Sequence, residues 1–203
     1  MKLNKIIALC KKAKVIVIYN RRRDEDGEIM EQWIGDGAAC YLVPGMPILD
    51  SESAGAILDI PAKDADKWQI LERELPPVFD FTDDAAKDGE TVFDEGPISF
   101  HYGGVMLRPL RSHGGAPLFI DLRYLTPFID SLNSLFLYRR TAENGLDYVA
   151  VKVGMVLAGI IMPRRVENEE FVRELRTLAE DVERAFEAGR EEEGGGVGKG
   201  RSA

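Results

Sequence analysis

Cysteine and histidine are scarce in this chain of 203 residues, which contains only two of each. Two cysteines cannot build a disulfide framework, and their spacing fits no zinc site, so a reducing compartment fits best. We expect both Cys10 and Cys40 to be small buried hydrophobic residues. No stretch approaches the roughly 20 apolar residues of a membrane span. Lysines interrupt the short apolar run at the N-terminus, unlike in a signal peptide. We therefore expect a cytoplasmic protein without a membrane segment.

Groups with catalytic potential are also sparse. No serine, cysteine or paired carboxylate stands at an interpretable spacing from His101 or His113. The acids between residues 80 and 95 lack the alternating oxygen ligands and fixed glycine of a calcium loop. The sequence therefore predicts no metal site, no cofactor and no enzyme activity. An enzyme with a site around His113, which lies in a glycine-rich loop, remains an alternative.

The net charge of −9 is unevenly distributed along the chain. Residues 1–23 contain eight Lys and Arg and no acid, whereas residues 50–95 contain fourteen acids and four bases. An acidic protein with one basic segment disfavours general polyanion binding but permits one local anionic contact. The basic segment includes a predicted helix at 3–13, whose lysines are suited to a phosphate backbone. The alternative is an ordinary solvated helix face, and no interleaved aromatic residues support base stacking. The candidate DNA contacts here are Lys5, Lys11, Lys12 and Lys14.

Two parts of the chain repeat one order of elements, a helix followed by three strands. In each copy the first strand ends in tyrosine just before arginines, and the third strand follows a glycine turn and ends at a proline. Internal repetition of this kind determines a fold, so the sequence predicts an α+β protein. The first copy has a helix at 3–13 and strands at 15–19, at a segment ending at 34, and at 38–43. The second copy has a helix at 122–133 and strands at 134–138, 148–153 and 156–162.

The remaining segments are an insertion and a C-terminal extension. The insertion, at about 46–97, is predicted to be helical and acidic, with a helix over Asp64–Leu75 and a surface excursion over 79–96. Apolar residues at spacings of three and four predict an amphipathic helix over 167–189. The Glu- and Gly-rich tail at 190–203 is predicted to be disordered.

The segment from Phe119 to Leu125, with the apolar residues that follow it, resembles the C-terminal domain of bacterial DNA sliding clamps. The similarity continues at the glycine turns and ends in residues 160–166, which resemble the terminal Met-Pro-Met-Arg-Leu of that family. It covers residues 119–166. A clamp domain consists of two copies of strand, helix and three strands, which is consistent with the internal repeat.

The resemblance implies particular sites and partners. Clamp helices line a hole for duplex DNA, which assigns this role to the four N-terminal lysines and to Arg123. The family's pocket for a polymerase-type or other protein partner corresponds here to Met162 and Pro163. A clamp ring contains many more than two copies, so we expect a homo-oligomer.

The chain also departs from the clamp pattern. The second helix offers only Arg123, with Asp121 and Asp130 nearby. The first copy lacks room for a leading strand, and Arg164 replaces an apolar residue. The family also ends where this chain adds a helix, whose apolar face we expect to pack over the partner pocket or over a neighbouring subunit.

These patterns together predict a clamp-like domain at 1–166, followed by a C-terminal amphipathic helix. The favoured function is a non-catalytic binding or scaffold protein from a replication context, such as a phage or mobile element. The alternative is a small-molecule-binding or regulatory domain that shares only the fold.

Overall fold

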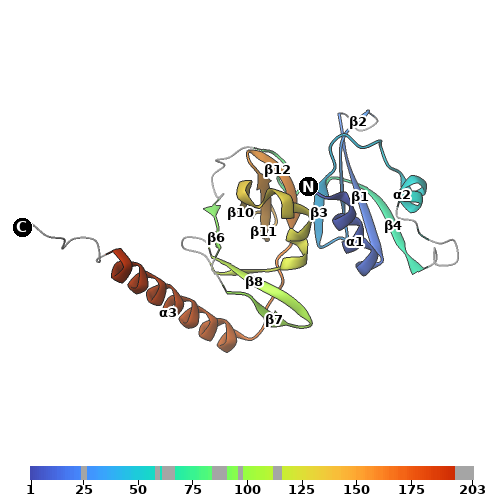
Figure 1. The fold of residues 1–203 in the computed structure, drawn as a ribbon. Helices are drawn as coiled ribbons and strands as arrows, with labels where there is room; N and C mark the ends of the chain where they lie inside the picture. Colours follow the sequence, from blue (N-terminus) through green and yellow to red (C-terminus); the bar gives the residue numbers. More distant parts are fainter. Residues whose placement is uncertain are drawn as a thin grey trace, which may run out of the picture.

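The protein is a mixed α+β structure, as predicted (Figure 1). In the part of the chain described here, eight strands form one sheet and four strands form a second. The computed structural model describes residues 1–23, 27–57, 60, 67–83, 91–95, 98–111 and 116–194.

The large sheet has the strand order β4-β1-β2-β3-β12-β11-β10-β5. Strands β1, β2 and β3 form one antiparallel group, and β10, β11 and β12 form another. The two groups join where β3 pairs with β12, with Tyr41 opposite Gly159. The strands are β1 (Val15–Arg22), β2 (Ile29–Gly35), β3 (Ala39–Leu42), β4 (Gln69–Glu74), β5 (Thr91–Val92), β10 (Leu135–Thr141), β11 (Asp147–Val153) and β12 (Val156–Ile161).

One helix precedes each antiparallel group. The α-helix α1 (Leu3–Ala13) leads into β1, and the 3₁₀-helix η2 (Leu122–Ser134) leads into β10. Pro127 lies inside η2 and has no N–H to donate, which disfavours a regular α-helix there. The backbone N–H of Lys2 donates to the carbonyl of Pro127 at 2.7 Å, so α1 and η2 are neighbours.

The large sheet is covered on both faces. On one face α1 and η2 bury Ile6 and Phe128 in the main core. On the other face, Phe79 and Phe81 pack around Trp33. The predicted surface excursion over 79–96 is therefore wrong for the described residues, because Phe81 is only 9% exposed and β5 belongs to the large sheet.

The insertion is not predominantly helical. It contains the short helix α2 (Ser51–Ile57), but the predicted helix over Asp64–Leu75 is wrong, since Gln69–Glu74 form strand β4. β4 pairs in parallel with β1, and Ile70 lies opposite Ile16. A few apolar residues spaced by three and four cannot reveal pairing with a strand about fifty positions earlier. The part of this prediction at 64–66 lies outside the described residues.

The smaller sheet is formed around β8, which pairs with three other strands. Its members are β6 (Asp94–Glu95), β7 (Phe100–Tyr102), β8 (Val105–Arg111) and β9 (Leu118–Asp121).

The C-terminal helix α3 (Glu169–Gly194) starts beside the smaller sheet and extends away from the body (Figure 1). It begins two residues later than predicted and continues past the predicted end at Gly189. A glycine inside a helix costs about 1 kcal/mol relative to alanine, and three good helix formers follow at 191–193. The helix also includes the first residues of the predicted disordered tail, and 195–203 lie outside the described residues.

Candidate nucleic-acid interface

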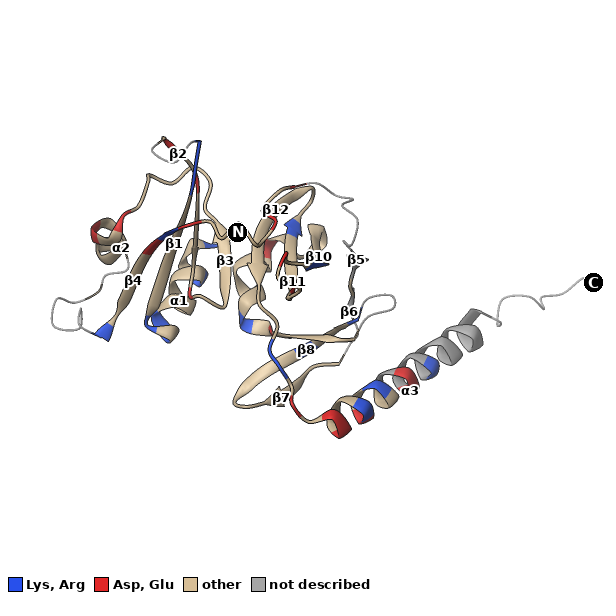
Figure 2. Ribbon diagram, turned by 180° about the vertical axis from the view of Figure 1, so that it is seen from behind, with Lys and Arg blue, Asp and Glu red and all other residues tan. Residues whose placement is uncertain are grey.

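The outer side of α1 carries a cluster of exposed lysines. The helix buries Ile6, Leu9 and Cys10 against the sheet, which leaves its charged side chains in solvent. Figure 2 shows these Lys residues in blue on α1, whereas Asp and Glu are red on α2. We call this cluster the α1 lysine face, and it consists of Lys5, Lys11, Lys12 and Lys14, all exposed.

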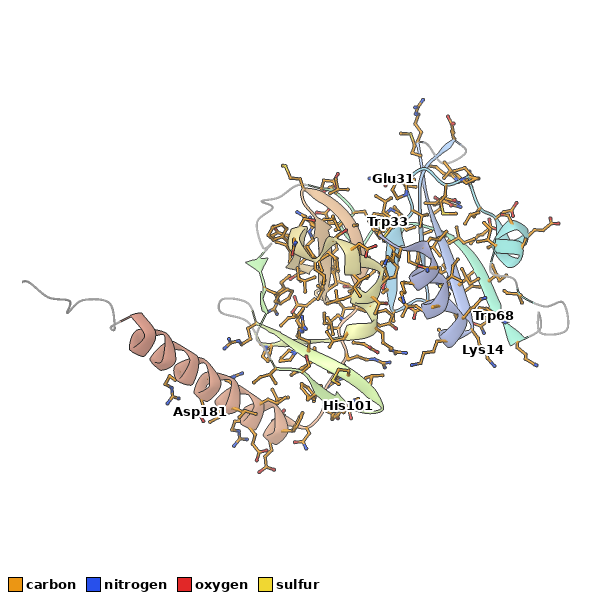
Figure 3. The ribbon with its side chains drawn as sticks, viewed as in Figure 1. Lys14, Glu31, Trp33, Trp68, His101 and Asp181 are labelled. Atoms are coloured by element: carbon orange, nitrogen blue, oxygen red, sulfur yellow. The ribbon has the colours of Figure 1, made fainter. Side chains whose placement is uncertain are left out.

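Lys14 occupies a special backbone position at the end of α1. Its φ of 57° places it in the left-handed region, where it ends the helix. Its carbonyl accepts a hydrogen bond of 3.1 Å from the N–H of Gln69, at the start of β4. Lys14 is therefore fixed between α1 and β4, close to Trp68 (Figure 3).

Other bases in the N-terminal segment have acidic partners. Arg21 pairs with Glu31, and Arg22 pairs with Glu74 at 3.0 Å. Lys2 pairs across to η2, with its Nζ 2.9 Å from a carboxylate oxygen of Asp130. By contrast, within the described ranges no member of the α1 lysine face forms an ion pair with a carboxylate.

The helix dipole accounts for only part of this cluster. Lys11 and Lys12 lie in the last turn of α1, where the negative end of the dipole stabilises cations. Lys5 lies in the first turn, where a positive charge is disfavoured, and no acid in that turn offsets it. The charge at Lys5 therefore has no local structural explanation.

Arg123 differs from the lysines, because its charge is matched by a buried carboxylate. Asp121 is 0% exposed, and one of its oxygens accepts a hydrogen bond of 2.8 Å from Nε of Arg123. This hydrogen bond raises the pKa of Arg123. Asp121 also accepts from the backbone N–H of Arg123 at 3.0 Å and so caps η2. Arg123 thus stabilises the start of η2 and adds no unpaired cation to the α1 lysine face.

The two predicted partner-pocket residues lie in different places. Met162 donates its backbone N–H to the carbonyl of Ala38 at 2.8 Å and packs against the core that contains Trp33. The cavity beside it holds only about 40 Å³. Pro163 lines a separate groove of about 450 Å³. The structure therefore places the two residues of the predicted partner pocket beside separate cavities.

The groove beside Pro163, which we call the basic groove, is lined by apolar residues and by more bases than acids. Its lining includes the apolar Phe119 and Leu146, the arginines Arg164, Arg165 and Arg176, and the acids Asp147 and Glu169. Its sides come from β9, the turn before β11 and the first turns of α3. Sequence analysis missed this groove because its walls are brought together only by the fold. In the sequence, only the adjacent arginines Arg164 and Arg165 indicate a basic site here.

Candidate catalytic and metal-binding groups do not converge in the described residues. Within those residues, no group of three or more His, Cys, Asp or Glu residues could hold a metal ion. His101 is exposed on β7, while His113 lies outside the described residues (Figure 3). Cys10 and Cys40 are buried, as predicted, and burial raises the pKa of each thiol to about 12. Both thiols are therefore poor nucleophiles in the folded protein.

Among the described helices, none is both long and apolar enough to cross a membrane. Comparisons with protein-family models, with curated proteins and with solved structures find no match to this chain.

The fold and the site define the class of this protein. In its described part it is an α+β protein with a basic helix on one face of a continuous eight-stranded sheet.

Proposed function

We propose that this protein is a non-catalytic scaffold that binds duplex DNA through the α1 lysine face. The observation that supports this proposal is the presence of four exposed lysines that lack carboxylate partners among the described residues, in a chain of net charge −9. In so acidic a protein, the lysines of an ordinary solvated helix face would be expected to have carboxylates close to them. The free cations are instead available for phosphate oxygens.

The geometry of α1 suits a phosphate backbone better than base recognition. Lys5 and Lys12 are two helical turns apart, which places them about 10 Å from each other along the helix axis. Flexible lysines act as point charges and carry little sequence information. Binding should therefore be independent of sequence and strongly dependent on salt.

The arrangement of the large sheet supports a clamp-like role. Each three-stranded group is preceded by a helix, and α1 and η2 lie side by side on the same face. This resembles the two-copy plan of a sliding-clamp domain, in which paired helices face DNA. Because Asp121 neutralises Arg123, we assign DNA contact mainly to α1. A replication or mobile-element accessory factor that works as a homo-oligomer is the corresponding biological role.

A salt series of duplex binding tests the proposal. Four phosphate contacts give a slope of about −3.6 in log K against log salt, so a fourfold rise in salt weakens binding on the order of 100-fold. The measurement is fluorescence anisotropy of a labelled duplex of arbitrary sequence, starting at low salt.

The variant Lys11→Ala/Lys12→Ala should reduce the steepness of that slope by about 1.8. The matched control, Arg173→Ala/Arg184→Ala on α3, removes the same charge from exposed positions far along the chain. It should leave the slope unchanged. Absence of binding at low salt, or equal losses in both variants, contradicts the proposal.

The basic groove favours a second candidate, a small-molecule-binding or regulatory domain. Its volume of about 450 Å³ lies in the range of ligand pockets, and Arg164, Arg165 and Arg176 suit an anionic ligand. Titration calorimetry with inorganic pyrophosphate tests this candidate. Heat that disappears in Arg164→Ala/Arg165→Ala supports it, and absence of heat from the unaltered protein removes it.

A further inference from the structure

The basic groove carries positive charge that the described part of the chain does not neutralise. Its arginines Arg164, Arg165 and Arg176 are all exposed, and none of them forms an ion pair with a described carboxylate. Arginine presents a planar fork of N–H donors that matches the oxygens of a phosphate or carboxylate, whereas lysine acts as a point charge. The groove is therefore better suited than the α1 lysine face to hold one anion in a defined orientation.

The two acids of the groove are accounted for by other contacts. Asp147 is paired with Arg139, and it also accepts a hydrogen bond of 2.8 Å from the hydroxyl of Thr141. Glu169 lies in the first turn of α3, where the positive end of the helix dipole stabilises a carboxylate. With Asp147 already paired, the groove holds three arginines and one acid, which is an excess of two positive charges. An anion with two negative charges would balance this excess.

Contacts within the chain hold the walls of the groove in place. The backbone N–H of Arg164 donates to the carbonyl of Phe119 at 2.7 Å, which fixes the segment with the two adjacent arginines beside β9. The start of α3 is held by Phe171, whose ring packs edge-on against Phe100 with 5.2 Å between centroids. Because these walls are already ordered, a ligand loses little free energy in ordering them.

The groove also offers apolar surface beside its arginines. Leu146, on the turn before β11, is 53% exposed, and Val166 and Val172 are half-buried. An inorganic anion would leave this surface in contact with water, whereas an apolar group attached to the anion would cover it. The volume of about 450 Å³ is large enough for a whole small organic molecule.

We propose that the basic groove binds a small, free phosphate monoester that carries an apolar body. Such a monoester has close to two negative charges at neutral pH, which matches the excess charge of the arginines. The arginines bind its phosphate oxygens, and the apolar lining covers its body. This inference rests on the second candidate function, the binding of an anionic ligand in the groove. It does not depend on DNA binding, since the groove and the α1 lysine face share no residue.

Titration calorimetry of the full chain with phenyl phosphate and with inorganic phosphate tests the class of ligand. At about pH 8 both probes are mainly dianions, so they differ chiefly in the phenyl group. Phenyl phosphate should bind at least about tenfold more tightly, because binding removes its ring and the apolar lining from water. Phenol, which has the ring without the phosphate, should give no measurable heat.

Two pairs of variants test whether the groove is the binding site. Arg176→Ala should weaken the binding of phenyl phosphate on the order of tenfold, because it removes charged hydrogen-bond donors. Its control, Arg173→Ala, removes the same charge from an exposed position of α3 outside the groove and should have little effect. Leu146→Ala should reduce the preference for phenyl phosphate over inorganic phosphate. Its control, Met155→Ala, truncates an apolar side chain that is 79% exposed on the turn after β11, and should keep that preference. Circular dichroism shows whether each variant is folded.

The outcomes separate this inference from the candidate function on which it rests. If pyrophosphate binds through Arg164 and Arg165 but phenyl phosphate binds no more tightly than inorganic phosphate, the candidate function stands and the inference is wrong. If no phosphate probe gives heat, both fail. Equal losses in Arg176→Ala and Arg173→Ala would also overturn the inference, because the anion would then bind outside the groove. Phenol that binds as tightly as phenyl phosphate would overturn it as well, since the phosphate would then contribute nothing.

Discussion

Replacement of Arg140 should be among the most destabilising changes in this protein. Arg140 lies on β10 with only 5% of its surface exposed. Its Nη1 donates to the carbonyl oxygens of Asp80 and Thr82 at 2.9 and 3.0 Å. These bonds hold the segment that carries Phe79 and Phe81, which closes the second face of the large sheet. We therefore expect Arg140→Ala to loosen this segment and expose the core beneath it.

The magnitude follows from the lost hydrogen bonds. A hydrogen bond from a charged donor contributes about 1.5–3 kcal/mol, and Arg140 makes two to part-buried backbone carbonyls. Removal of the guanidinium also ends its own desolvation cost, which offsets part of the loss. The net expectation is about 3–5 kcal/mol of unfolding free energy. For a chain of this length, that lowers the melting temperature by roughly 10 °C.

Urea unfolding followed by circular dichroism and tryptophan fluorescence measures this loss. Trp33 is a suitable reporter because it contacts Phe81, with 5.0 Å between ring centroids. The control is Arg184→Ala, whose side chain is 72% exposed and pairs with Asp181 within one turn of α3. It should cost less than about 0.5 kcal/mol. If Arg140→Ala unfolds within about 1 kcal/mol of the unaltered protein, the inferred role of Arg140 is wrong.

Three further predictions concern other buried or paired groups. Gln32→Leu should lower the free energy of unfolding by about 2–4 kcal/mol, as measured by thermal unfolding. The Gln32 side chain pairs with both the backbone N–H and the carbonyl of Leu49, and the variant would leave these two buried groups without partners. Cys10 and Cys40 should resist iodoacetamide at pH 8 when folded, because each thiol pKa is raised to about 12, and should react once urea unfolds the chain, as mass spectrometry can show. Hydrogen bonding to Arg139 lowers the pKa of Asp147, so its stabilising contribution is present above the ordinary carboxyl value of 3.8 and is lost as pH falls through the lowered value. In Asp147→Asn this carboxyl no longer titrates, so the melting temperature of the variant should fall less than that of the unaltered protein as the pH is lowered below 3.8.

Local sequence signals predicted the elements that are held together by short-range interactions. The helix at 3–13 has the bounds of α1, because its apolar spacing and the turn at Lys14 are both local. The β-branched run at 15–19 became part of β1 for the same reason. Both groups of three strands were recognisable because each is connected by short turns.

Elements that depend on distant partners were not predictable in this way. Strand β4 exists because it pairs with β1, and β5 exists because it pairs with β10. The role of the arginines could not be read from residue type either. The sequence placed Asp121 near Arg123, but only the fold shows that the two side chains pair, whereas Lys5 has no carboxylate partner among the described residues.

The proposed interface depends on how rigidly the two halves of the large sheet are joined. The two halves are connected by the pairing of β3 with β12 and also by side-chain hydrogen bonds. Tyr41 donates its hydroxyl to the carbonyl of Tyr124 at 2.9 Å, and Tyr124 donates to a carboxylate oxygen of Asp36 at 3.0 Å. At Gly159 an added Cβ would lie 3.0 Å from the ring of Phe128, so β12 and η2 approach too closely for a larger residue. Since these contacts fix η2 relative to the turn between β2 and β3, they also fix the neighbouring α1. The lysines of α1 are thus presented on a surface already held in place, and less ordering entropy opposes their contact with phosphate.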